Sequence, residues 1–220
     1  MYVSGVSEHQ PHISHYVRIH KGRILKDGNL YYEAETADLP EFLHGLYRHL
    51  GMQYPKFFKM DPLCKASLLA AEILLGPGKQ IELPENTAVI LSNASSSLDT
   101  DLRHQASITG PGNFFPSPAV FVYTLPNIAV GEICIKYGLK GENGFYIFPR
   151  FHAGFLSTYI GGLFEEGKTE LCIGGWVEVF ENTADILLFL TGTKEKGIPF
   201  EPEELNKIFA PNETTWKNRN

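Results

Sequence analysis

The sequence is poor in cysteine and contains no long uninterrupted apolar run. Its three cysteines, Cys64, Cys134 and Cys172, form no C-x-x-C pair, so they predict no disulfide framework, zinc site or dithiol redox site. The longest apolar candidate, residues 108–135, is interrupted by glycines, prolines and Glu132, which argues against a membrane span. Residues 1–5 lack the charged and apolar regions of a secretory signal peptide. We therefore expect a cytoplasmic protein without a metal or a cofactor.

Basic residues are scarce relative to acidic ones. With 19 Lys and Arg against 25 Asp and Glu, the formal net charge is −6, which disfavours a general nucleic-acid-binding protein. The 220 residues are 43% hydrophobic and 20% charged, ordinary values for a chain that buries a core. The sequence contains no internal repeat and no long linker, so residues 1–220 are predicted to form one domain.

Four histidines lie close together near the N-terminus: His9, His12, His15 and His20. The first three are three residues apart, a spacing that would line one face of a helix and suit a metal site. Pro11 interrupts the segment, however, and no cluster of carboxylates accompanies it. We therefore interpret this stretch as a polar loop.

Apolar runs of strand length alternate with helical patterns along the chain. The expected strands are residues 2–6, 87–91, 144–148, 170–179 and 184–191. The expected helices begin near Asp38 and then cover residues 59–75, 99–108, 117–137, 152–166 and 202–209. An additional hairpin, residues 16–36, has turn signals at Lys21-Gly22 and Asp27-Gly28. This order predicts an α/β fold with a five-stranded, mostly parallel mixed sheet and helices on both faces.

A serine-rich run, residues 92–97, follows the expected strand 87–91. Such a run after a strand invites comparison with a phosphate-binding loop, but it lacks the Gly-x-x-x-x-Gly-Lys arrangement. We interpret its small residues as the means by which the backbone turns and packs.

Four segments carry a resemblance to a known family. Residues 54–61 precede the first long helix, residues 124–133 contain Pro126 and Asn127, residues 137–143 read YGLKGEN, and residues 166–178 contain Gly174 and Gly175. In this order they resemble segments of the β-ketoacyl (3-oxoacyl) carrier-protein synthases. The resemblance implies a thiolase-like fold, of which this chain holds only the first of two sheet-and-helix units. It also implies that the hairpin 16–36 is an insertion.

The chain departs from the family at the position of the catalytic nucleophile. In the synthases a cysteine opens the helix after the third strand, where the helix N-terminus favours the thiolate. The corresponding residues here are Pro149, Arg150, Phe151 and His152. The family's two catalytic histidines belong to the second half, and this chain ends at Asn220. The resemblance therefore implies a degenerate, non-catalytic subunit similar to a chain-length factor.

The resemblance also implies a partner. Family members dimerise by pairing their third strands, and the matching interface residues here are Phe145, Tyr146, Ile147 and Phe148. An uncharged, aromatic-rich strand left at a sheet edge would aggregate, so we expect a mate. That mate is a second copy or a full-length synthase, in bacterial fatty-acid or aryl-polyene-type biosynthesis. Candidate tunnel or interface residues, equally explained as core, are Phe114, Phe115, Phe121, Tyr123 and Phe151.

Two alternative functions stay open at this point. The chain could be a small acyl-thioester-modifying enzyme with His152 as its base, although no Gly-x-Ser-x-Gly elbow is present. It could also bind an acyl carrier protein, with Arg150 contacting an anion such as a phosphopantetheine phosphate. Arg150 is equally explained as a solvated surface charge.

Overall fold

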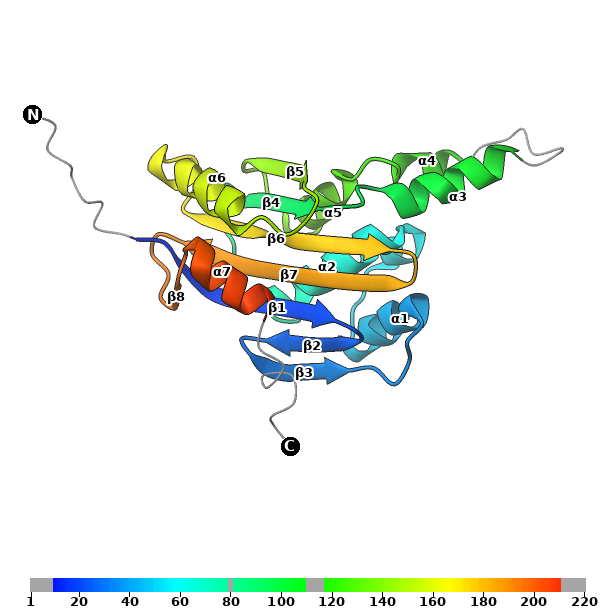
Figure 1. Ribbon diagram of the computed structural model, residues 1–220, viewed down its shortest axis with the longest axis horizontal. Helices are drawn as coiled ribbons and strands as arrows, with labels where there is room; N and C mark the ends of the chain where they lie inside the picture. The colour runs from blue at the N-terminus through cyan, green and yellow to red at the C-terminus, as the bar shows by residue number, and fades with distance from the viewer. Residues whose placement is uncertain (1–9, 79–80, 110–116, 211–220) are drawn as a thin grey trace, which may run out of the picture.

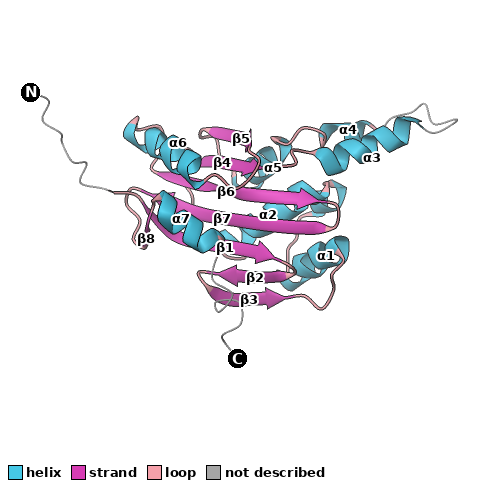
Figure 2. Ribbon diagram, viewed as in Figure 1, coloured by secondary structure: helices cyan, strands magenta, loops and turns pink. Residues whose placement is uncertain are grey.

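The computed structural model describes residues 10–78, 81–109 and 117–210, which form one mixed sheet with helices on both faces (Figures 1 and 2). The strands are β1 His12–His20, β2 Arg23–Lys26, β3 Asn29–Glu33, β4 Ala88–Asn93, β5 Asn143–Ile147, β6 Leu171–Phe180, β7 Thr183–Gly192 and β8 Ile198–Pro199. The helices are α1 Leu39–His49, the 3₁₀ helix η1 Pro55–Lys59, α2 Pro62–Leu75, α3 Leu98–Thr109, α4 Pro118–Val122, α5 Ile128–Tyr137, α6 Ala153–Glu165 and α7 Pro202–Phe209. The strand order is β3-β2-β1-β7-β6-β4-β5, with β8 beside β1.

The first three strands form a meander that belongs to the main sheet. Both expected turns are present: Lys21 and Gly22 have φ of 49° and 73°, and Asp27 and Gly28 have φ of 50° and 78°. Two successive positive φ angles suit tight hairpins, because they match the right-handed twist of the flanking strands. Since β1 also pairs along its length with β7, the hairpin 16–36 extends the sheet rather than standing apart from it.

The histidine-rich segment is a strand, so its interpretation as a loop was wrong. Pro11 only precedes β1, and the strand buries Ile13, Val17 and Ile19. Nδ1 of His15 lies 2.9 Å from a carboxylate oxygen of Asp27, so this side chain contacts the turn between β2 and β3. Among the described residues, no group of three metal-ligating side chains is found. The expected strand 2–6 and His9 lie outside the described residues.

The expected strand number and direction need correction, although the α/β class with a mixed sheet is confirmed. Within the described residues the sheet has eight strands, not five. Only β4–β5 and β4–β6 are parallel, whereas β6–β7 and all pairs of β1, β2, β3 and β8 are antiparallel. The reason is that β1 to β3 join the sheet beyond β7 by antiparallel pairing, which leaves the parallel strands at one end.

Two hydrophobic clusters, one on each face, hold the helices to the sheet. Helix α2 is buried along most of its length beneath the sheet, together with α1 and α5, and Asp61 caps its N-terminus by accepting the Cys64 N–H at 2.9 Å. Helices α6 and α7 pack on the opposite face around Leu156 and Leu205. Among the helices of the described residues, none combines the length and apolar character that crossing a bilayer requires.

The single long helix expected at residues 117–137 is in fact two helices. Pro126 lies between α4 and α5; it has no N–H to donate, and it disfavours helical geometry at Leu125. The break separates α5, which packs under the sheet, from α4, which pairs with α3 in an arm that extends away from the sheet (Figure 1).

Candidate functional site

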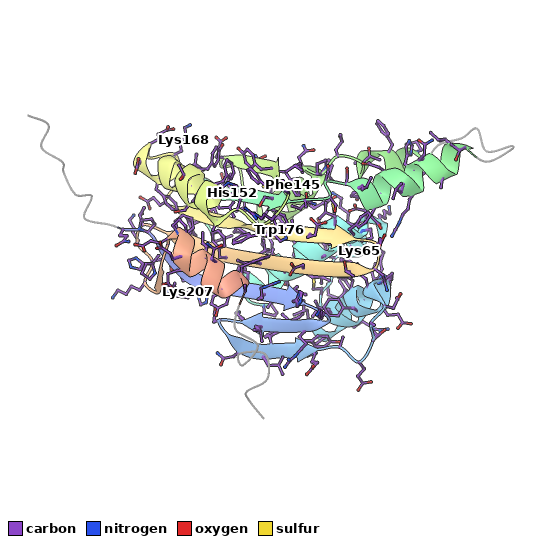
Figure 3. All side chains as sticks on the ribbon, viewed as in Figure 1. Lys65, Phe145, His152, Lys168, Trp176 and Lys207 are labelled. Atoms are coloured by element: carbon purple, nitrogen blue, oxygen red, sulfur yellow. The ribbon has the colours of Figure 1, made fainter. Side chains whose placement is uncertain are left out.

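Helix α6 begins beside the carboxyl ends of the parallel strands, where the family resemblance places the nucleophile. His152 is its N-cap residue, and its Nδ1 accepts a hydrogen bond from the Phe155 N–H at 3.0 Å (Figure 3). This bond requires a lone pair on Nδ1, so a proton on that nitrogen would break the cap. The ring therefore has a structural role at the start of the helix, and only Nε2 remains for any other contact.

Aromatic rings surround this helix start. The rings of Phe148 and His152 have centroids 5.1 Å apart, and Phe148 lies 4.7 Å from Phe155. On the other side, Phe151 stacks on Phe209 of α7 at 4.3 Å and meets Trp176 of β6 edge-on at 6.3 Å. Phe151 is thus held between α7 and β6, which is the core role that the sequence left open for it.

The other residues at this position are exposed. Pro149 and Arg150 both lie at the surface, and Arg150 makes no hydrogen bond or ion pair with another described residue. The guanidinium of Arg150 is therefore exposed to solvent.

None of the three thiols lies at this helix start. Cys64 and Cys134 pack in the cluster around α2, on the opposite face of the sheet from α6. Cys172 pairs with Ala88 at the amino ends of β6 and β4, whereas α6 begins at the carboxyl ends. Burial raises the pKa of the Cys64 and Cys172 thiols well above the ordinary value and raises that of Cys134 as well. Cys64 and Cys172 are therefore core residues, and Cys134 is partly buried beside the core.

The serine-rich loop after β4 is closed by a carboxylate that the sequence analysis missed. Oε2 of Glu178 accepts the N–H groups of Ala94 at 2.6 Å and Ser95 at 3.1 Å. The next N–H, that of Ser96, donates to Oδ1 of Asn93 at 2.9 Å. Because these donors are already satisfied, the loop is not a phosphate cradle. The available signal was an acidic residue within the apolar run Leu171–Phe180.

Strand β5 forms one end of the sheet, and its second edge has no partner among the described strands. Phe145 packs into the cluster around α2, while Tyr146 packs against Phe155 and Tyr159 of α6, with ring centroids 4.7 and 5.3 Å apart. Ile147 remains 49% exposed, and Ile135 of the neighbouring α5 is 65% exposed. Of the expected interface residues, Ile147 is thus the most accessible apolar one, while the aromatic rings are half-buried on both faces (Figure 3 labels Phe145).

The other candidate tunnel residues divide between core and surface. Tyr123 is buried and donates to Oε1 of Glu132 at 3.3 Å, so it belongs to the core. Phe121, on the arm, is 57% exposed. Phe114 and Phe115 lie outside the described residues.

No family model matches the sequence, and no curated protein matches it. Solved structures do. The ishigamide ketosynthase/chain length factor aligns with a TM-score of 0.63 at 19% identity, over 86% of this chain and 63% of that chain. The ketosynthase ApeO in complex with its chain length factor ApeC, from Xenorhabdus doucetiae, aligns with a TM-score of 0.55 at 11% identity, over 91% and 90%. A β-ketoacyl synthase from Burkholderia phymatum gives 0.51 at 11% identity, over 84% and 59%. The fold is that of ketosynthase and chain-length-factor chains.

Within this ketosynthase-like fold, the two glycines that carried the resemblance have a packing role. A Cβ on Gly174 would lie 2.5 Å from the ring of Phe189, and one on Gly175 would lie 2.1 Å from the Leu187 carbonyl oxygen. Pro126 and Asn127 mark the break before α5, where Asn127 is the N-cap residue without a side-chain hydrogen bond. These four residues therefore have roles in packing and at a helix boundary. The chain spans 63% of the ishigamide chain but almost all of the chain matched in the ApeO–ApeC complex.

Proposed function

We propose that this chain is a non-catalytic, ketosynthase-like subunit that pairs through β5 with a full-length ketosynthase in bacterial fatty-acid or polyene-type biosynthesis. The observation that carries the proposal is the edge of β5. It ends the sheet, contains no charged residue in Asn143–Ile147 and leaves Ile147 half exposed. No strand of the described residues pairs with its outer edge, so the backbone N–H and C=O groups there offer a template for a partner strand. A partner strand at this edge would bury Ile147 and provide hydrogen-bond partners for the backbone N–H and C=O groups of β5.

Two further observations support the proposal. Solved structures with the same fold include a ketosynthase together with its chain length factor, and one of these chains has nearly the same length as ours. At the start of α6, Pro149 to His152 supply no thiol, and Nδ1 of His152 is used as a helix cap. Carbon–carbon bond formation by thioester condensation needs a covalent acyl carrier, which the partner would provide.

The two alternatives have less support. No hydroxyl or thiol of a described residue is hydrogen-bonded to His152, so a thioester-cleaving role would have to rely on Nε2 alone. Binding of a carrier protein through Arg150 has one exposed cation in its favour. Pairing through β5 would engage a whole strand edge, whereas each alternative rests on one side chain, so we favour pairing.

The proposal is tested by co-expressing the chain with a full-length synthase from the same genome. We expect the two to co-purify and to give the mass of a heterodimer by size-exclusion chromatography with light scattering. The chain alone should not condense acyl and malonyl thioesters on a carrier protein. A complex carrying a synthase without its nucleophilic cysteine should be inactive too. A chain that stays monomeric beside the synthase at micromolar concentration would contradict the pairing. Turnover by the chain alone would contradict the non-catalytic role.

A further inference from the structure

A pocket of about 620 Å³ lies far from the start of α6. It is formed where the β1–β2 turn, the β6–β7 turn and the segment leading into α1 meet at one end of the sheet (Figure 1). Buried side chains of Ile19, Leu39 and Phe42 are among its lining residues. Pockets of this size with apolar walls are typical of sites for small organic molecules.

Hydrogen bonds tie the three wall segments to one another. The Ala34 N–H donates to the Gly22 carbonyl at 3.0 Å, which fixes the connection to α1 against the β1–β2 turn. The side chain of Asn182, in the β6–β7 turn, accepts the Leu39 N–H at 2.9 Å and donates to the Ala37 carbonyl at 3.3 Å. The pocket is therefore preformed, and a ligand would not have to order its walls.

The charges around the pocket balance. Oδ1 of Asp185 lies 2.5 Å from Nη1 of Arg18 and 3.1 Å from Nδ1 of His20, so this carboxylate is already compensated. The exposed side chains of Lys21 and Glu35 carry opposite charges. A charged ligand would gain little here, because its attraction to one of these groups is offset by repulsion from the other.

We propose that this pocket binds an uncharged, mainly apolar small molecule that fills the space above Leu39 and Phe42 and forms hydrogen bonds with polar groups at the rim. The site lies on β1, β7 and α1, away from β5, so it is independent of the proposed pairing. It gives the chain a second binding function that the strand edge does not require.

The test uses Nile red, an uncharged dye whose fluorescence rises in apolar surroundings, with the whole chain. We expect saturable binding of one dye per chain. Ala184→Trp places a large ring in the pocket and should weaken binding at least tenfold. Ala106→Trp, on the exposed surface of α3, is the matched control and should leave binding unchanged. Leu102→Asp removes a 56% exposed apolar side chain from the arm and should also have no effect, which excludes dye binding there.

A second filling variant, Ala34→Trp, guards against misfolding of the first, and circular dichroism verifies both. The anionic dye 1-anilinonaphthalene-8-sulfonate should bind more weakly than Nile red and compete poorly with it. Equal Nile red affinity for the folded wild-type, Ala184→Trp and Ala34→Trp chains would overturn the proposal. So would loss of binding in Leu102→Asp, because it would place the dye on the arm.

Discussion

The two edges of the sheet differ in the way they meet solvent. At one edge, β3 carries Glu33, whose carboxylate lies 3.1 Å from Nε of Arg23 on β2. The pairing of β2 with β3 is also interrupted by a shift in register. At the other end, β5 has no charged residue and pairs with β4 in unbroken register. Charges and bulges on an edge strand discourage pairing with another chain. β3 therefore has features that oppose pairing with another chain, and β5 lacks them, which is the difference on which the proposed pairing through β5 rests.

The strongest way to break this comparison is to place the same charge on both edges. Ile147→Lys puts an ammonium group into the proposed interface, and we expect the Kd for the synthase to rise at least 100-fold, which corresponds to about 2.8 kcal/mol. Leu30→Lys on β3 is the matched control, since Leu30 is 45% exposed and Ile147 is 49% exposed. Isothermal titration calorimetry measures both. An equal loss of affinity for the synthase in both variants, or no loss in Ile147→Lys, would show that β5 is not the edge that binds the partner.

Both substitutions should leave the isolated chain folded. Each side chain is about half exposed, and surface substitutions change the free energy of unfolding by roughly 0.5 kcal/mol or less. Urea unfolding provides this control, so a change in Kd can be assigned to the interface.

A weaker effect is expected from removing the protection of β3. Glu33→Val deletes the charge on β3 and makes this strand more like β5. We expect new self-association with a Kd of the order of 100 μM, since the remaining Arg23 and the irregular register still oppose it. Sedimentation velocity at increasing concentration detects it, with Glu41→Val on α1 as the control. A Glu33→Val chain that stays monomeric at millimolar concentration would show that charge is not what protects this edge.

The sequence predicted the helix starts and the tight turns of this fold, because these features depend on residues that are close together in the chain. Helix α1 begins at Asp38 as expected, and the Lys21-Gly22 and Asp27-Gly28 turns are where the pattern indicated. The start of α6 at His152 was also predicted from the sequence and is confirmed.

Long-range pairing was not accessible in the same way. The partner of β1 is β7, about 170 residues later, and nothing in residues 12–20 specifies it. The histidine-rich start of β1 was interpreted as a loop because Pro11 precedes it and its residues do not alternate regularly, whereas its pairing with β7 makes it a strand. The clamp of Glu178 on the serine-rich loop depends on β4 and β6 being neighbours, so it could not be read from either segment alone.

The smallest effect concerns the titration of Tyr146 on β5. Burial, followed by the hydrogen bond and charge of Tyr159, raises the pKa of Tyr146 to about 12. Because the folded-state pKa lies above the unfolded value of about 10, this tyrosine stabilises the fold fully below pH 10. That contribution is lost as the pH rises from about 10 to about 12, and Tyr146→Phe should flatten the loss of stability over this interval.

Titration of Tyr146 also distinguishes the two edges directly, through nuclear magnetic resonance of ¹³C-labelled tyrosine. A partner strand on β5 would cover the remaining exposed part of Tyr146 and raise its pKa further, because desolvation disfavours the phenolate. Tyr31 on β3, whose pKa is raised by burial and by the charge of Glu72, should titrate identically with and without the synthase. A shift of Tyr31 on binding, with Tyr146 unchanged, would place the partner at the opposite edge of the sheet.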